Sequence, residues 1–407
     1  MDTTQSDPSE ELRSQWTSPG DIFSFLLLIG GDVVQKALAQ QVGVSIQLCS
    51  TVEIGLTPVA FSFGWVAYAF MSLMSTLGDH QLMPQSTDCP SIIVNCSNSF
   101  VRANQSWVLG RLLRDHECAY EVDPGRESLR IDIYELRPSH SPDVDFVWVI
   151  GWVIILVQTG ISIIPWAVYQ DWGIFMITCS GTILSLATGS MRQWRSNKWS
   201  GRTLGPGKNK VTCLTRGNGN FHAMVFIGRP GSWDIESLAS ARSISQKETK
   251  WITITLAVLW TCLLISASGL KRHSWFLIAV GGIGMLQNVY AAGSARKPGA
   301  SNFHLRRPTG RSTIVGIQQL VTDIENSDDD DTSPDWLNAQ YNLDIENVMG
   351  ALIELEKTVP TAGLALLKVF YPGGLKYRKE RIRYKVERKF WKRAFQTVEG
   401  RSQKFWT

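Results

Sequence analysis

The sequence predicts an all-α membrane protein with about six transmembrane helices, a small mixed α/β cytosolic loop domain and a helical, basic C-terminal tail. Three observations predict this class: long apolar stretches without charge, tryptophans near the ends of those stretches, and charge concentrated between them. The mean hydropathy of the 407 residues is −0.03, because apolar stretches without charge and strongly charged segments are averaged together. A collagen-like repeat and a small disulfide scaffold are excluded, since the 34 glycines show no period and 7 cysteines are too few.

Five stretches are long and apolar enough to cross a bilayer as helices. A hydrocarbon core about 30 Å thick needs roughly 20 helical residues, and a soluble helix rarely runs so far without a polar face. Trp166, Trp172 and Trp251 lie near the ends of these stretches, where an amphipathic ring suits the headgroup layer. The five stretches are Leu56–Leu77, Phe146–Tyr169, Trp172–Ser190, Trp251–Leu270 and Ser274–Ser294.

The sixth candidate, Ile22–Ile46, begins with eight apolar residues and then becomes polar. It either spans with a polar face turned inward or lies in the membrane interface, and its length favours spanning. The acidic, polar residues 1–20 lack the features of a cleavable signal, so we expect this first span to act as the insertion signal.

These spans divide the chain into seven parts. We expect a polar N-terminal segment (1–20), the first two transmembrane helices (21–77), a long acidic loop (78–145), helices three and four (146–190), a basic cytosolic loop domain (191–250), helices five and six (251–294) and a soluble tail (295–407). The loop domain contains a hairpin, with strands Val211–Thr215 and Phe221–Ile227 around the turn sequence RGNGN, and a short helix within Trp233–Arg242.

Two features of the sequence give opposite predictions for the side of the membrane on which the long loops lie. Met191–Lys250 carries eleven Lys or Arg against three acidic residues, which favours the cytosol for this loop and, with six spans, for both termini. Residues 78–145 instead are acidic, contain three cysteines and carry two glycosylation sequons at Asn95 and Asn104, which suits an oxidising lumen. Two spans separate these loops, so they share one side. We expect the cytosolic side, with Asn95 and Asn104 as glycosylation sites only if the loop is lumenal.

The tail ends in a strongly basic segment. Leu375–Phe395 carries ten Lys or Arg against two Glu, downstream of a helical apolar face at Leu343–Leu355. The basic helix could contact anionic lipid, with Tyr377, Tyr384, Trp391 and Phe395 in the interface. It could also be a solvated helix, or it could bind nucleic acid or another acidic partner. We expect the lipid bilayer as the principal partner, biosynthetic enzymes as further candidates, and no nucleic acid.

No sequence motif identifies a cofactor, a metal or a catalytic residue. The segment Gly201–Lys210 resembles a phosphate-binding loop, but Arg202 stands where that loop needs glycine and Asn209 where it needs Ser or Thr. No zinc spacing, nucleophile elbow or kinase signature occurs. We therefore expect no cofactor, no metal site and no recognisable catalytic set.

Polar residues within or beside the spans are the candidate site. Such groups are costly in a membrane and usually face a bundle interior or a watery cavity. They could converge on a cavity that binds a ligand, or they could hold the bundle together by an ion pair and amide hydrogen bonds. The candidates are Asp32, Gln35, Lys36, Glu53, Gln158, Asp171, Gln287 and Asn288.

Four stretches resemble one family. They are SPGDIFSFLLLIGGDVVQKALAQ (Ser18–Gln40), LTPVAFSFGWVAYAF (Leu56–Phe70), TRGNGNFHAMVFIG (Thr215–Gly228) and SWDIESLASAR (Ser232–Arg242). They look like a largely uncharacterised family of multispanning membrane proteins from filamentous fungi, some of whose members lie in natural-product gene clusters. The resemblance covers about a third of the chain and offers no catalytic motif.

That resemblance implies an accessory role in fungal secondary metabolism at an endomembrane such as the endoplasmic reticulum. On this hypothesis the protein binds or helps cyclise a lipophilic intermediate, with the polar residues of the spans as its site. Two alternatives remain open: a membrane transporter of a small molecule, and a non-catalytic membrane scaffold for biosynthetic enzymes.

Overall fold

The protein is a mixed α/β membrane protein, so the predicted all-α class with six spans is wrong. It has 54% helix, 14% strand, a seven-stranded mixed sheet and three candidate membrane spans. The computed structural model describes residues 30–49, 52–78, 81–85, 89–138, 141–242, 246, 248–270, 272–317, 346–376 and 382–397. The chain forms two compact units: Met1–Pro84, His140–Ser200 and Ala241–Asn302 form the first, called the membrane unit below, and Gln85–Ser139, Gly201–Ser240 and Phe303–Thr407 form the second, called the soluble unit.

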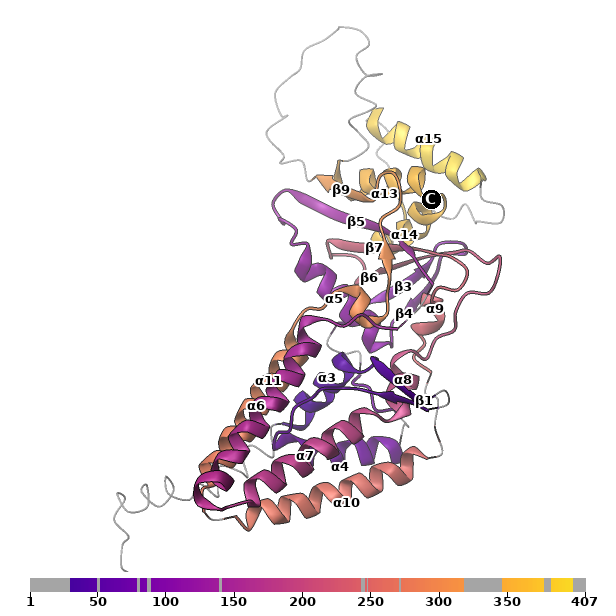
Figure 1. Ribbon diagram of the computed structural model, residues 1–407. Coiled ribbons are helices and arrows are strands. Elements are labelled where there is room, and N and C mark those ends of the chain that lie inside the picture. The colour runs from indigo at the N-terminus through magenta and orange to yellow at the C-terminus, as the bar shows by residue number, and fades with distance from the viewer. Residues whose placement is uncertain are drawn as a thin grey trace, which may run out of the picture. The chain divides into compact units, whose positions relative to one another are not determined.

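The membrane unit is a helical bundle (Figure 1). Within the described residues, α6, α10 and α11 are each long and apolar enough to span, and α7 with α8 passes the same test as a pair bent by 44°. Tryptophans predicted to mark the boundaries lie at helix ends, where Trp166, Trp172 and Trp251 are exposed. The helices are α3 (Gly31–Gln41), α4 (Gly64–Leu77), α6 (Phe146–Tyr169), α7 (Gly173–Gly189), α8 (Arg192–Lys198), α10 (Thr249–Ser268) and α11 (Ser274–Gly293), followed by the 3-10 turn η2 (Pro298–Ser301).

The first two predicted spans are not continuous helices. Residues 22–29 lie outside the described part, and α3 ends at Gln41 before Gly43, whose φ of +143° a helix does not allow. The chain then forms the antiparallel strands β1 (Ser45–Cys49) and β2 (Val52–Gly55). Residues 56–62, called the extended segment below, are in neither helix nor strand and include a tight turn in which the amide of Val59 donates to the carbonyl of Thr57. This agrees with the bias of the residue before Pro58 away from helix. The remaining α4 has 14 residues, about 21 Å long, too short to span.

The soluble unit determines how many times the chain crosses the membrane. Segments 85–139, 201–240 and 303–407 supply strands to one sheet, so all three lie on the same side. The chain passes through α6, α7 and α8 between the first two segments, and through α10 and α11 between the last two. Each interval therefore needs an even number of crossings. If α6 crosses the membrane, the bent pair α7–α8 has to cross with it, so parity agrees with four candidate spans in the described part of the chain.

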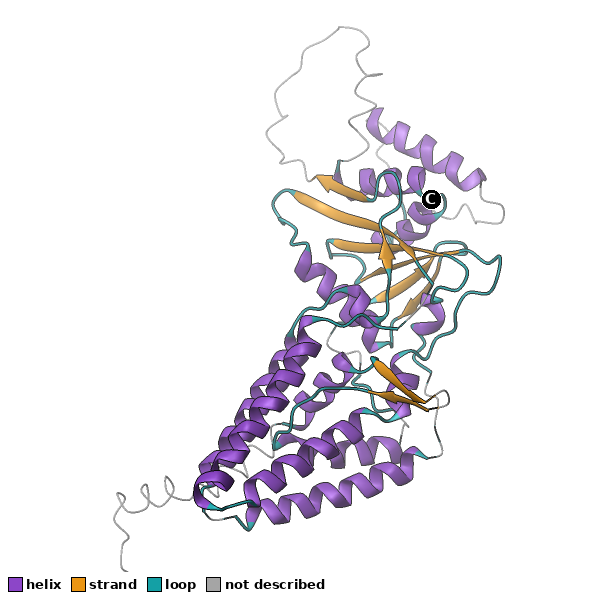
Figure 2. Ribbon diagram, in the orientation of Figure 1, coloured by secondary structure: helices purple, strands orange, loops and turns teal. Residues whose placement is uncertain are grey.

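Figure 2 shows the strands of the soluble unit gathered in one sheet. These strands come from three separate regions of the chain, 85–139, 201–240 and 303–407. Its order is β4-β3-β6-β7-β5-β8, with β9 also paired to β5; β5 and β7 are parallel and the other pairs are antiparallel. The predicted hairpin is confirmed as β6 and β7, joined by a turn with Gly217 and Gly219 at positive φ. The strands are β3 (Ile92–Asn95), β4 (Phe100–Ala103), β5 (Glu127–Leu136), β6 (Lys210–Thr215), β7 (His222–Gly228), β8 (Leu305–Arg306) and β9 (Thr313–Ile317).

Helices cover both faces of this sheet, and the strands alternate accordingly. On β5, Leu129, Ile131 and Ile133 pack with α13 (Asn347–Thr358), α14 (Ala362–Phe370) and α15 (Ile382–Thr397). Tyr134 and Leu136 pack on the other face with α5 (Trp107–Ala119) and α9 (Ile235–Leu238). The result is a three-layer α/β/α unit with two apolar cores.

Candidate functional site

Three of the predicted intramembrane residues meet at the extended segment 56–62. Gln158 on α6 donates from Nε2 to the carbonyl oxygens of Phe61 and Val280, both at 2.7 Å. On α11, Gln287 Oε1 accepts from the amide of Ala60 at 3.1 Å, and Asn288 Nδ2 donates to the Ala60 carbonyl at 3.3 Å. Non-helical backbone at membrane depth needs such partners, because hydrocarbon offers none. These three amide side chains therefore stabilise the backbone of segment 56–62 by hydrogen bonds.

The other predicted residues lie elsewhere in the membrane unit. Asp32 and Lys36 pair with each other at 3.2 Å, with their side chains 61% and 29% exposed, so they do not enclose a site. Gln35 donates to the carbonyl of Leu82. Asp171, in the turn between α6 and α7, lies 3.3 Å from His273 Nδ1.

Glu53 belongs to β2, in register with Gln47, and its side chain lies outside the described part. With three residues at the extended segment and the others apart from it, the eight candidates do not form one cavity.

A different polar cluster lies in the soluble unit, on the face of β5 that α5 covers. It contains His116 from α5, Asp132 from β5 and His222 from β7. The period-two geometry of β5 places Asp132 on the same face as Arg130 and Tyr134. The parallel register sets His222 opposite Arg130, and β9 sets Thr313 opposite Asp132.

Asp132 is the most strongly held member of this cluster, with 1% of its side chain exposed. Its carboxylate accepts hydrogen bonds from Thr313 Oγ1 at 2.7 Å and from Arg130 Nε at 2.9 Å, and His116 Nε2 lies 3.2 Å from Oδ2. Burial alone would raise the pKa of Asp132, but contacts with His116, Thr313 and Arg130 outweigh it and hold that pKa well below its usual range. Asp132 is therefore an anion at neutral pH.

The two histidines differ in environment. His116 Nε2 lies near the Asp132 carboxylate without the geometry of a hydrogen bond, and both ring nitrogens of His116 are buried without a hydrogen-bond partner within the described residues. The ring of His222 lies perpendicular to it at 5.8 Å, and its Nδ1 is also unpartnered there. Burial, together with the nearby His116, lowers the pKa of His222. An ionised carboxylate next to one imidazole, with a second imidazole beside it, is an arrangement suited to moving protons.

The solvent side of the cluster is formed by cations around Tyr120. The ring of Tyr120 lies 5.0 Å from that of His116, and the guanidinium of Arg130 lies 4.5 Å from the Tyr120 centroid. Arg307, which is exposed, donates to the Tyr120 hydroxyl at 3.1 Å. This rim would attract the anionic end of a ligand.

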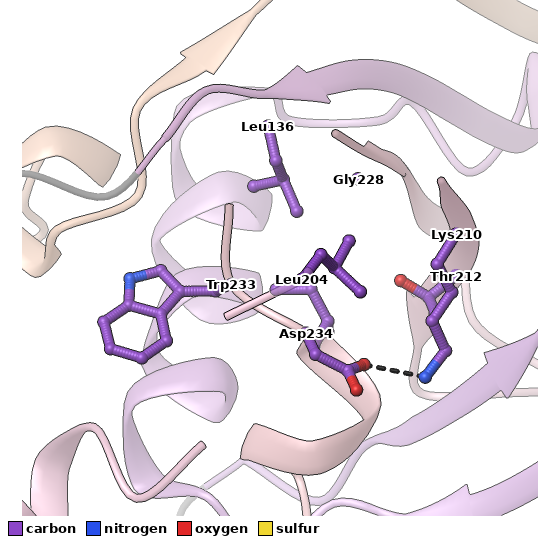
Figure 3. Close-up of a pocket in the computed structure, with 8 residues that line it drawn as sticks. Leu136, Leu204, Lys210, Thr212, Gly228, Trp233 and Asp234 are labelled. Atoms are coloured by element: carbon purple, nitrogen blue, oxygen red, sulfur yellow. Dashed lines mark hydrogen bonds and ion pairs between the residues drawn. The ribbon is translucent and has the colours of Figure 1, made fainter. Parts of the chain in front are cut away.

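A second polar feature of the soluble unit is a small hollow beside β6 and β7 (Figure 3). It is too narrow to hold a water molecule and is lined by Leu136, Leu204 and Trp233. Lys210 Nζ lies 2.7 Å from Asp234 and 2.8 Å from Glu236, so its polar groups satisfy one another. Ligand pockets usually measure about 300 Å³ or more. We assign no ligand to this hollow.

Both sequon asparagines are buried in the soluble unit. Asn95 Nδ2 donates to Glu236 at 2.7 Å, and Asn104 Nδ2 donates to Ser91 Oγ and to the Ser106 carbonyl, each at 3.0 Å. A glycan is attached to this same nitrogen. Glycosylation of either residue would therefore displace interior hydrogen bonds of the folded unit.

Comparison with known proteins identifies no relative: no family model matches the chain, and neither a curated protein nor a solved structure matches it. The site therefore stands on its geometry.

The sequence analysis missed the cluster, although two signals were present. In residues 129–134, LRIDIY, apolar and polar residues alternate as in a half-buried strand, which places Arg130 and Asp132 on one face. In residues 107–119, apolar residues recur at helical spacing and lead to His116. What the sequence could not supply is the pairing of β5 with β7 and β9, because the partner strands follow after intervening spans.

We expect acid to destabilise the soluble unit through His222. Its lowered pKa means that the unfolded chain binds a proton more readily, so the stabilising contribution is complete above about pH 6.5 and is lost as pH falls below it. The measurement is the apparent Tm of the full chain in detergent at pH 7.5 and 5.5. His222→Gln should lose less Tm over this window than the native protein, by a few degrees, since about 1 kcal/mol corresponds to roughly 2–4 °C. Equal losses would contradict the assignment.

Proposed function

We propose that this membrane protein binds the polar, anionic end of a lipophilic compound at the soluble unit and moves a proton there through His116. The observation that carries the proposal is the buried His116–Asp132 pair with His222 beside it. The candidate spans tether the soluble unit to a bilayer through the chain, and lipophilic compounds partition into bilayers. Asp132 would orient His116 and stabilise its protonated form, as carboxylates do for catalytic histidines.

Arg130 and Arg307 would provide the anion contact in this proposal. Arg307 is exposed at the rim, and Arg130 lies between Tyr120 and Asp132. Movement of the Tyr120 side chain would open a route to His116, whose ring lies behind it. The resemblance to fungal membrane proteins suggests the setting: an accessory step, such as a cyclisation in secondary metabolism, at the endoplasmic reticulum or another endomembrane.

The test replaces the chromosomal gene with point variants and profiles the metabolites of the producing organism. His116→Gln and Asp132→Asn should lower the product about 10²-fold or more, the usual scale for acid–base groups. Asp32→Asn is the matched control, because the Asp32–Lys36 pair is partly exposed and lies in the other unit. Equal amounts of each variant in the membrane fraction exclude a loss of folding.

The Asp32→Asn control also distinguishes this proposal from the hypothesis that the polar residues of the spans form the site. If Asp32→Asn abolishes the product while His116→Gln does not, the site lies among the spans and the proposal is wrong. Transport is less well supported, because Gln158, Gln287 and Asn288 are engaged by the extended segment.

A non-catalytic scaffold for biosynthetic enzymes is the second candidate. It is favoured by the construction of the soluble unit, in which one sheet is assembled from segments on both sides of each pair of spans and is thereby held at the membrane. A scaffold predicts that His116→Gln and Asp132→Asn leave the product unchanged when the protein is present at normal amounts.

A further inference from the structure

The C-terminal helix α15 presents a cationic face. Residues 382–397 contain six Lys or Arg and a single acidic residue, Glu387. Lys385, Arg388, Lys389 and Lys392 are exposed, at spacings of three and four residues that place them on one side of the helix. Like charges at these spacings destabilise an isolated helix, so an opposite charge outside the helix would relieve their repulsion.

The apolar side of α15 is already occupied by its own unit. Trp391 is 0% exposed and Phe395 is 5% exposed, and both belong to the core that α13 and α14 form on the sheet. The indole of Trp391 lies with Nε1 3.2 Å from Met349 Sδ. The expectation that Trp391 and Phe395 lie in the membrane interface is therefore not met in the folded unit. The exposed side of α15 therefore consists mainly of Lys and Arg side chains.

We propose that the exposed face of α15 binds anionic phospholipid headgroups of the membrane in which this chain is anchored. Clusters of Lys and Arg beside a membrane are attracted by the negative surface of an anionic leaflet. The chain connects α15 to the candidate spans, so binding to that membrane is intramolecular in effect and does not need high intrinsic affinity. Because Trp391 and Phe395 are buried, we expect the contact to be electrostatic, without insertion of these rings, and to weaken as salt rises. The proposal does not depend on the chemistry of His116.

The test measures how fast the lysines of α15 react with an amine-acylating reagent, by mass spectrometry of the full chain. The protein is reconstituted in nanodiscs of phosphatidylcholine alone, or with about a quarter phosphatidylserine. In the anionic discs Lys385, Lys389 and Lys392 should react at least threefold more slowly than in neutral discs, and 0.5 M NaCl should remove the difference. Lys208, exposed on another loop of the same unit, is the internal reference and should not change.

A matched pair of variants tests the cause of the protection. Lys385→Gln, Lys389→Gln and Lys392→Gln together remove three charges from α15 and leave Trp391 and Phe395 in place. Arg126→Gln, Arg137→Gln and Lys208→Gln remove three exposed charges elsewhere in the unit. Hydrogen exchange of α15 should slow in anionic discs for the second variant, as for the native protein, and not for the first.

Three outcomes would overturn the proposal. They are equal lysine reactivity in both lipids, protection that persists in 0.5 M NaCl, and protection that appears only after an acidic protein or RNA is added. The last would assign the face to a soluble partner instead of the bilayer.

Discussion

Gly284→Ala should prevent the membrane unit from folding correctly, while Gly282→Ala on the same helix should be tolerated. A Cβ at Gly284 would overlap the carbonyl oxygen of Phe61 and lie 2.6 Å from Gln158 Nε2. The extended segment 56–62 would have to move away from α11, and its hydrogen bonds to Gln287 and Asn288 would be lost with it.

The expected cost of Gly284→Ala combines two terms. Overpacking of a buried site costs about 1–3 kcal/mol, and each buried backbone group left without its partner adds about 1–3 kcal/mol. The sum is a large part of the stability of an ordinary domain. At Gly282, by contrast, an added Cβ meets nothing within 4 Å. Alanine is the better helix former, so stability there should stay the same or rise slightly.

The measurement is the apparent Tm of the full chain in detergent, with the fraction that elutes as a monodisperse species. A second pair repeats the comparison on α6: a Cβ at Gly151 would overlap the carbonyl oxygen of Pro58, while at Gly160 it meets nothing within 4 Å. If Gly284→Ala and Gly282→Ala have the same Tm, segment 56–62 does not pack against α11 in this way.

The sequence was a good guide to hydrophobic elements and a poor guide to elements that are held by distant partners. The charge-free stretches at Phe146–Tyr169, Trp251–Leu270 and Ser274–Ser294 became α6, α10 and α11, because a long apolar helix is determined by its own composition. Leu56–Leu77 has a similar composition, yet its first part is the extended segment. That outcome depends on Gln158, which lies about a hundred residues further along the chain.

The same contrast applies to the soluble unit. The hairpin of β6 and β7 could be predicted, because both strands and their glycine turn are adjacent in sequence. The sheet could not, because β3, β5 and β9 approach this hairpin only after intervening spans. The site depends on this sheet. Asp132 and His222 come from strands separated by α6, α7 and α8, so a search for polar residues within the spans led to Gln158 instead.

Gln158→Leu should strongly destabilise the membrane unit, although leucine is the more favourable residue in hydrocarbon. The carbonyl of Val280 lies inside α11 and keeps its helical hydrogen bond, but the carbonyl of Phe61 would lose the hydrogen bond that Gln158 donates to it. A buried carbonyl left unpaired costs about 1–3 kcal/mol, and the release of the extended segment adds to this. Thr255→Val is the control, since the Thr255 hydroxyl is exposed and bonds only within α10.

A double-mutant cycle with Asn288→Leu gives the sharper result. Gln158 and Asn288 hold neighbouring carbonyls, those of Phe61 and Ala60, so loss of either should loosen the same segment. The two substitutions together should then cost less than the sum of the single effects, by about 0.5–3 kcal/mol, as for residues that share one network. Strict additivity would show that the two amides act independently. A Gln158→Leu variant more stable than the native chain would show that the amide is retained at a cost in stability. Polar residues within spans that are kept despite such a cost are usually functional. This result would therefore support the hypothesis that the site lies among the spans.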